Sequence, residues 1–127
     1  MRLVIVRHAE AAQGAPDELR PLTPHGKEQA RELGRRLRDE LGVVDAVLSS
    51  PLLRARETAE ALGLGAPEPD ERLAPGATAD DVRETVAGRG ETVVVVGHQP
   101  DCGRIAAALG DVEEPPFPPA GVRVVEL

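Results

Sequence analysis

The sequence contains no tryptophan or tyrosine and only one phenylalanine among its 127 residues. Its formal net charge at pH 7 is −7. Proteins that bind nucleic acids usually need a basic surface to meet the phosphates and aromatic rings to stack on the bases. This chain has neither, so we do not expect a nucleic acid as its partner.

Cysteine is also nearly absent. Cys102 is the only one, which excludes an internal disulfide and a zinc cluster built from cysteines. A cysteine phosphatase would have an arginine six residues further on, but Ala108 stands there. Because Cys102 falls on the apolar stripe of an expected helix, we predict a core residue rather than a nucleophile.

No apolar run approaches the roughly 18 residues that a membrane span requires. The apolar stretch near the N-terminus is interrupted by Arg7 and is not followed by a small-residue cleavage site. We therefore expect a soluble, cytoplasmic protein with no membrane partner. The length predicts one domain covering residues 1–127, and the oligomeric state is left open.

Metal and nucleotide motifs are missing as well. The three histidines do not form a close-spaced pattern such as H-x-x-x-H, and no Walker loop or G-x-G-x-x-G follows a strand. We therefore expect no metal and no cofactor.

Short apolar runs alternate with segments of helical periodicity. Strands are predicted at 3–6, 43–48, 92–96 and 122–125, with at most a short one at 71–73, and helices at 24–41, 53–62, 79–87 and from Pro100 onwards. Residues 9–22 are predicted to form a loop over the mouth of the site. Alternating strands and helices indicate a three-layer α/β/α fold with a mostly parallel sheet, helices on both faces and a C-terminal edge strand.

Cationic side chains follow three of the predicted strands. Arg7 and His8 end the first strand, Arg54 lies in the first helical turn after the second, and His98 ends the strand at 92–96. The carboxyl ends of parallel strands meet at one edge of the sheet, where catalytic crevices lie. This placement predicts a phosphate site in which His8 attacks phosphorus and Arg7 holds the phosphate.

Each of these residues also has a plainer interpretation. A histidine at a strand end is often structural, and Arg54 could pair with Glu57 on its own helix. Arg20 is either a substrate-binding residue or an ordinary charge of the loop. His25, in the first turn of the long helix, is expected at the surface.

Four segments, VIVRHAEA, RPLTPHG, SSPLLRARETA and VVVVGHQP, resemble the histidine phosphatase superfamily in sequence and order, and most of all its short SixA-type phosphohistidine phosphatases. The one departure in the first segment is Ala9, where the family usually has glycine. The resemblance implies that His8 is the phosphorylated nucleophile and that Arg7, Arg54 and His98 bind the phosphoryl oxygens. The neighbouring arginines should keep His8 unprotonated.

The resemblance implies a metal-independent phosphatase whose substrate is phosphohistidine in a protein. A phosphatase of small phosphomonoesters, such as sugar or nucleoside phosphates, is the first alternative, and a phosphate-binding module without turnover is the second. Relatives that cleave alkyl phosphates carry a carboxylic acid after the third strand, and the corresponding position here is Pro75. Because an alkoxide leaves poorly without an acid, this absence favours P–N over P–O substrates.

Overall fold

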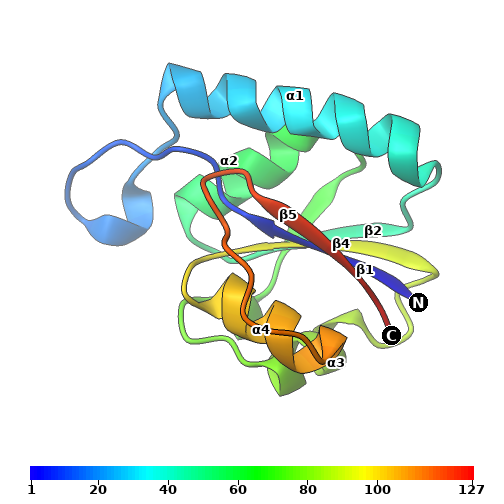
Figure 1. Ribbon diagram of the computed structural model, residues 1–127. Coiled ribbons are helices and arrows are strands. Elements are labelled where there is room, and N and C mark those ends of the chain that lie inside the picture. Colours follow the sequence, from blue (N-terminus) through cyan, green and yellow to red (C-terminus); the bar gives the residue numbers. More distant parts are fainter.

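The computed structural model describes residues 1–127 as a five-stranded sheet between two layers of helices (Figure 1). The elements in chain order are β1 (Arg2–Arg7), α1 (Pro24–Leu41), β2 (Ala46–Ser49), α2 (Leu53–Leu62), β3 (Pro67–Pro69), α3 (Ala79–Val86), β4 (Thr92–Gly97), α4 (Asp101–Gly110) and β5 (Val122–Glu126). Two short 3₁₀ turns lie at Asp17–Leu19 and Glu71–Leu73. None of the helices is both long and apolar enough to cross a membrane.

The sheet has the strand order β3-β2-β4-β1-β5. Strands β1 to β4 are paired in parallel, and β5 alone runs antiparallel, at the edge beside β1. The carboxyl ends of β1, β2 and β4 consequently meet at one edge, on the left in Figure 1. The predicted fold class, including the C-terminal edge strand, is confirmed.

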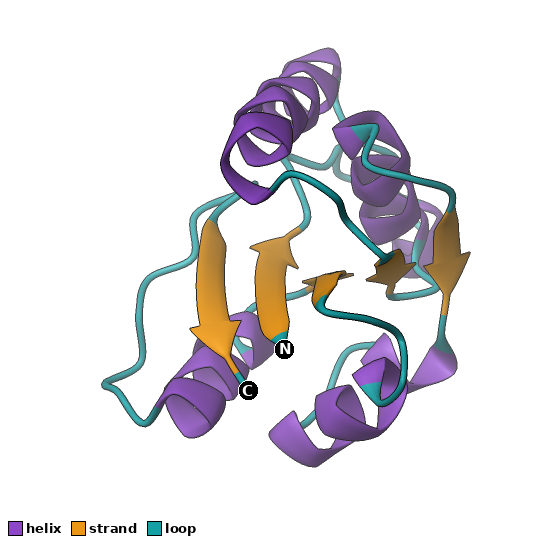
Figure 2. Ribbon diagram, turned by 90° about the vertical axis from the view of Figure 1, so that its right-hand side faces the viewer, coloured by secondary structure: helices purple, strands orange, loops and turns teal.

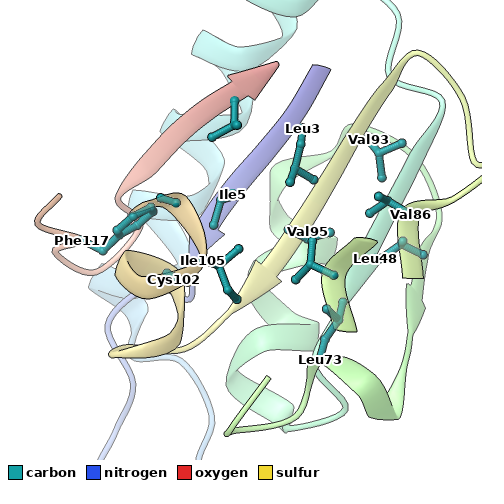
Figure 3. Close-up of a cluster of buried hydrophobic side chains, with 13 residues drawn as sticks. Leu3, Ile5, Leu48, Leu73, Val86, Val93, Val95, Cys102, Ile105 and Phe117 are labelled. Atoms are coloured by element: carbon teal, nitrogen blue, oxygen red, sulfur yellow. The ribbon is translucent and has the colours of Figure 1, made fainter. Parts of the chain in front are cut away.

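Alternate residues of the central strands supply two separate cores. Val4 and Val6 of β1 pack with Leu33 and Leu37 of α1 and with α2 on one face. Leu3 and Ile5 of the same strand, together with Val95 of β4, pack against α3 and α4 on the other (Figures 2 and 3). Burial on both faces explains why these strands are continuous apolar runs rather than alternating ones.

The helix ends follow their sequence signals. The Thr23 side chain accepts a hydrogen bond from the backbone N–H of Gly26 at the start of α1, and Gly42 caps the other end. Thr78 and Asp81 form a reciprocal capping box at the start of α3. These signals set the boundaries of helices that were predicted from periodicity.

Two predicted strand boundaries are wrong. The run at 43–48 becomes a strand only from Ala46, because Val43 is 80% exposed and the Asp45 carboxylate accepts hydrogen bonds from the backbone N–H groups of Glu91 and Thr92. Residues 71–73 form a 3₁₀ turn, because the Asp70 side chain caps it, and the strand is the preceding Pro67–Pro69. In both places, a side chain that hydrogen-bonds to the backbone replaces the pairing between strands that the sequence pattern predicted.

Candidate functional site

Backbone hydrogen bonds join the ends of the three central strands. The N–H of His8 donates to the carbonyl of Gly97 at 3.0 Å, and the N–H of Ser50 donates to the carbonyl of Val96 at 2.9 Å. The N–H of Cys102 donates to the carbonyl of His98 at 2.8 Å, which fixes the start of α4. The side chains that follow these strands are therefore held at one edge of the sheet.

The two strand-end histidines lie together there. Their ring centroids are 5.3 Å apart, with the ring planes inclined at 57°. His8 and His98 are each less than a tenth exposed, and so is Arg54. The structure thus brings together residues that are up to 90 positions apart in the chain.

The hydrogen bond of the His8 ring defines its tautomer. Nδ1 lies 2.7 Å from the carbonyl oxygen of Ala9, and since a carbonyl can only accept, Nδ1 must carry the hydrogen. In the neutral ring, Nε2 then holds a lone pair. This is the arrangement in which an imidazole can act as a nucleophile.

Burial lowers the pKa of both rings. The pKa of His8 falls from 6.5 to about 4, mainly through burial and also through the charges of Arg54 and Arg7, against an opposing effect of the bond to Ala9. The pKa of His98 falls to about 3, again mainly through burial. The expected direction for His8 is confirmed, but burial has a larger effect than the arginine charges that were expected to cause it.

The Arg7 side chain, next to His8 in the chain, has one buried nitrogen without a hydrogen-bond partner. An Nη1–H of Arg7 donates to the carbonyl of Phe117 at 3.0 Å, whereas its Nε–H is buried without a partner. Nδ1 of His98 is likewise buried without a partner. Buried polar groups are nearly always hydrogen-bonded, so these two nitrogens are candidates for contacting an anion.

Arg54 does not pair with Glu57 on its own helix. Its guanidinium donates to the backbone carbonyl of Asp17 at 2.9 Å and to the Asp17 carboxylate at 3.2 Å. The Glu57 carboxylate instead accepts from the backbone N–H of Leu22. Three hydrogen bonds to two residues of α2 thus hold the loop at 9–22 against the site.

Arg20 joins the same arrangement from the loop itself. It donates to the carbonyl of Ala12 at 2.7 Å and to the Asp17 carboxylate at 3.0 Å. Hydrogen bonds from Arg20, and secondarily from Arg54, hold the pKa of Asp17 below its usual value. Arg20 is close enough for its charge to contribute to the lowered pKa of His8.

The remaining residues singled out in the sequence lie outside this cluster. His25 is exposed and faces Glu10 across 3.9 Å. Cys102 is buried in the core and burial raises its pKa to about 12, so its thiol is not ionised near neutral pH. No group of three or more histidine, cysteine, aspartate or glutamate side chains is arranged to hold a metal ion.

Two residues of the cluster were not identified from the sequence. Asp17 binds both Arg20 and Arg54, and Ser50 lies fully buried with its hydroxyl 2.7 Å from Nε2 of His98. The position of Ser50 directly after β2 could have revealed it, since Arg7 and His8 were found by the same reasoning. Asp17 carries no such signal, because its place depends on how the loop folds back.

Comparisons with known proteins agree with this geometry. The family model of the histidine phosphatase superfamily (branch 1) matches residues 3–75. Phosphohistidine phosphatase SixA of Escherichia coli is 33% identical over 127 residues, covering 92% of this chain and 79% of its own. An uncharacterized protein of Mycobacterium tuberculosis is 35% identical over 138 residues, covering 96% of this chain and 87% of its own.

A solved structure extends the similarity to three dimensions. The protein histidine phosphatase SixA complexed with tungstate superimposes with a TM-score of 0.89 at 28% identity, covering all of this chain and 88% of that one. This structural match spans all five strands. The chain is therefore a phosphatase that belongs to the histidine phosphatase superfamily.

Proposed function

We propose that this phosphatase works through a covalent phosphohistidine on Nε2 of His8 and removes phosphate from phosphohistidine in a protein. The observation that carries the proposal is the His8 ring itself. Its Nδ1–H is held by the Ala9 carbonyl at 2.7 Å, and a pKa of about 4 leaves Nε2 unprotonated at neutral pH. A nucleophile must be unprotonated and held in one orientation, and the bond to Ala9 and the lowered pKa support both for His8.

The first step transfers the phosphoryl group from one imidazole to another. The Nε2 lone pair of His8 forms a bond to phosphorus as the P–N bond of the substrate breaks. A substrate ring protonated on its second nitrogen leaves as neutral imidazole. His8, with its Nδ1–H kept by Ala9, becomes the equivalent protonated phosphohistidine, so the step is balanced without further proton transfer.

Water completes the reaction. Its oxygen bonds to phosphorus, the P–Nε2 bond breaks, and the bonding pair returns to Nε2 of His8. Both protons of the water remain with the released dihydrogen phosphate. The hydrogen on Nδ1 makes His8 a good leaving group in this step, because the ring departs neutral.

Arg7, Arg54 and His98 are proposed to bind the phosphoryl oxygens. Arg7 and His98 have buried nitrogens without partners, at Nε and Nδ1, and a phosphoryl group would supply acceptors. Donors aimed at the equatorial oxygens stabilise the charge that spreads over them in the transition state. The tungstate held by the solved relative is an oxyanion of similar shape, which supports an anion site in this fold.

The leaving group favours a P–N substrate. No proton donor is needed for an imidazole, whereas an alkoxide requires one. Asp17 is held by Arg20 and Arg54, and its lowered pKa makes it a poor acid at neutral pH. Glu71 is exposed on the 3₁₀ turn, and Pro75 occupies the position that the family resemblance assigns to an acid.

The proposal also covers the substrate class, the domain organisation, the location in the cell and the absence of a cofactor. The substrate is a phosphorylated protein. The name of the E. coli relative gives phosphohistidine as what that relative acts on, and the solved relative is called a protein histidine phosphatase. Arg20 contributes to binding the substrate beside Arg54. We propose that residues 1–127 act as one domain in the cytoplasm. Neither a metal nor a cofactor takes part.

The test is a substrate panel with the wild type, His8→Ala and His25→Ala. We expect the wild type to hydrolyse a phosphohistidine peptide or a simple phosphoramidate with a much higher kcat/KM than phosphoserine or sugar phosphates. Brief incubation and quenching should leave an acid-labile, base-stable phosphate on the His8 peptide. His8→Ala should abolish both, whereas His25→Ala, which removes an exposed histidine, should change neither.

Four results would contradict the proposal. Labelling of another residue, or full activity in His8→Ala, would exclude the mechanism. Equal cleavage of alkyl phosphates that is lost in Glu71→Gln would identify Glu71 as an acid and favour small phosphomonoesters. Binding of phosphate without any turnover would show that the protein is a phosphate-binding module and not an enzyme.

A further inference from the structure

A buried serine hydroxyl contacts one of the two ring nitrogens of His98. Ser50 is fully buried, and its Oγ lies 2.7 Å from Nε2 of His98. The same oxygen accepts a hydrogen bond from the backbone N–H of Leu52 at 3.2 Å. Ser50 thus links the start of α2 to the histidine that follows β4.

The protons in this contact can be assigned by counting donors and acceptors. A serine hydroxyl has one hydrogen to donate, and a fully buried one needs an acceptor for it. The Leu52 N–H already donates to Oγ, so that contact uses a lone pair and not the hydrogen. Nε2 of His98 is the acceptor that the structure offers to the Ser50 hydrogen.

This assignment determines which nitrogen of His98 carries the hydrogen. With a pKa lowered to about 3, the ring is neutral near pH 7 and has one N–H. If Nε2 accepts from Ser50, that hydrogen is on Nδ1, the nitrogen that is buried without a partner. The centroid of this ring lies 5.3 Å from that of the His8 ring, which places His98 in the cluster that is proposed to receive the phosphoryl group.

We propose that Ser50 is a positioning residue, whose hydroxyl donates to Nε2 of His98, fixes the Nδ1–H tautomer and so presents a donor to a phosphoryl oxygen. The assignment deepens the proposed function and rests on it for the identity of the ligand. The hydrogen bond between Ser50 and His98 itself does not depend on that function.

Of Ser49, the last residue of β2, and Ser50, which follows it, only Ser50 makes this contact. Successive residues of a strand point to opposite faces. Ser50 reaches His98, whereas the Oγ of Ser49, equally buried, has no hydrogen-bond partner. Ser49→Ala is therefore a matched control, because it removes a hydroxyl of the same burial one residue away.

The first test is the tautomer of His98 in the free protein. Long-range ¹H–¹⁵N correlation at pH 7 distinguishes protonated from unprotonated imidazole nitrogens. We expect Nδ1 to be protonated in the wild type and in Ser49→Ala, and Ser50→Ala to gain the Nε2–H form. A wild-type ring protonated at Nε2 would overturn the proposal even if Ser50→Ala did not fold.

The second test is the binding of inorganic phosphate, measured by calorimetry alongside kcat/KM on a phosphoramidate. A hydrogen bond to a charged group, once lost, weakens binding by roughly tenfold to a hundredfold. We expect such a loss in Ser50→Ala, with a thermal unfolding midpoint close to that of Ser49→Ala. Equal phosphate affinity in the two variants would overturn the role of Ser50.

The results that would contradict the proposed function differ from those that would contradict the role of Ser50. In that case, the wild type and Ser49→Ala would both leave phosphohistidine intact and His8 unlabelled. The tautomer of His98 and the phosphate affinities of the two serine variants would still decide the role of Ser50.

Discussion

At the scale of single residues, the site depends on burying cationic and titratable groups where water cannot satisfy them. Arg54 is 7% exposed, yet its guanidinium contacts only Asp17 among the acidic side chains. Burying a charged group to this degree costs free energy of folding unless a ligand or a partner compensates for its charge. After His8, Arg54 is therefore the residue whose replacement by another side chain, even one of the same charge, should affect activity most.

We predict that Arg54→Lys lowers kcat/KM by roughly a hundredfold, because a compact ammonium cannot replace a planar fork that bonds two oxygens at once. Steady-state kinetics on a phosphoramidate would measure this. Arg56→Lys is the control, since Arg56 is exposed on the same helix. Near-normal turnover in Arg54→Lys would remove Arg54 from the proposed pocket.

A second prediction concerns pH. The folded-state pKa values of His8 and His98, about 4 and about 3, lie below the ordinary 6.5. The unfolded chain therefore binds more protons, so the stability that these rings contribute is complete above pH 6.5 and is lost as the pH falls through the folded values. NMR titration of the ring protons should give midpoints below 5 for both residues. Midpoints near 6.5 would contradict the burial of these rings.

At the scale of secondary-structure elements, the close approach of α1 and α2 supports the helix that carries Arg54. Gly34 of α1 lies against the last turn of α2, where an added Cβ would overlap the carbonyl oxygen of Leu62. That obstacle is backbone rather than a flexible side chain. A larger residue would have to separate the two helices.

We predict that Gly34→Ala destabilises the protein by about 2–4 kcal/mol, since overpacking against backbone cannot be relieved by a rotamer change. Urea unfolding would measure the free energy of unfolding. The control is Arg36→Ala, at an exposed position two residues along the same helix, for which a change within about 0.5 kcal/mol is expected. Equal stability of the two variants would show that the helices can move apart at little cost.

At the scale of the whole molecule, a chain of net charge −7 concentrates positive side chains at one edge of its sheet. Arg7, Arg20 and Arg54 all lower the pKa of His8, so their charges converge on that ring. Such a field attracts an anion and disfavours a cation. These arginines are proposed to supply the charge stabilisation that metal ions provide in other phosphatases.

Dialysis against EDTA should accordingly leave kcat on a phosphoramidate within about twofold of its starting value, because the protein's own donors are proposed to stabilise the transition state. Activity before and after dialysis, with and without added Mg²⁺ or Zn²⁺, would measure this. A loss on chelation that a divalent ion restores would refute the prediction.

The layered fold could be predicted from the sequence because its signals are local. The apolar run at 3–6, the Thr23 cap and the Gly42 stop each depend on neighbouring residues, and each is found where it was expected. The errors at 43–48 and 71–73 arose where the side chains of Asp45 and Asp70 bond to the backbone. Composition and periodicity do not record such bonds.

The sequence by itself determined the strand ends at which Arg7, His8 and His98 lie, because parallel strands joined by helices must align their carboxyl ends. Only the tertiary structure decided that Asp17 meets Arg54 and that Ser50 meets His98. Both contacts join segments more than 35 residues apart, and both depend on the path of a loop or the direction of one side chain. These are set by packing in three dimensions, which no local pattern in the sequence encodes.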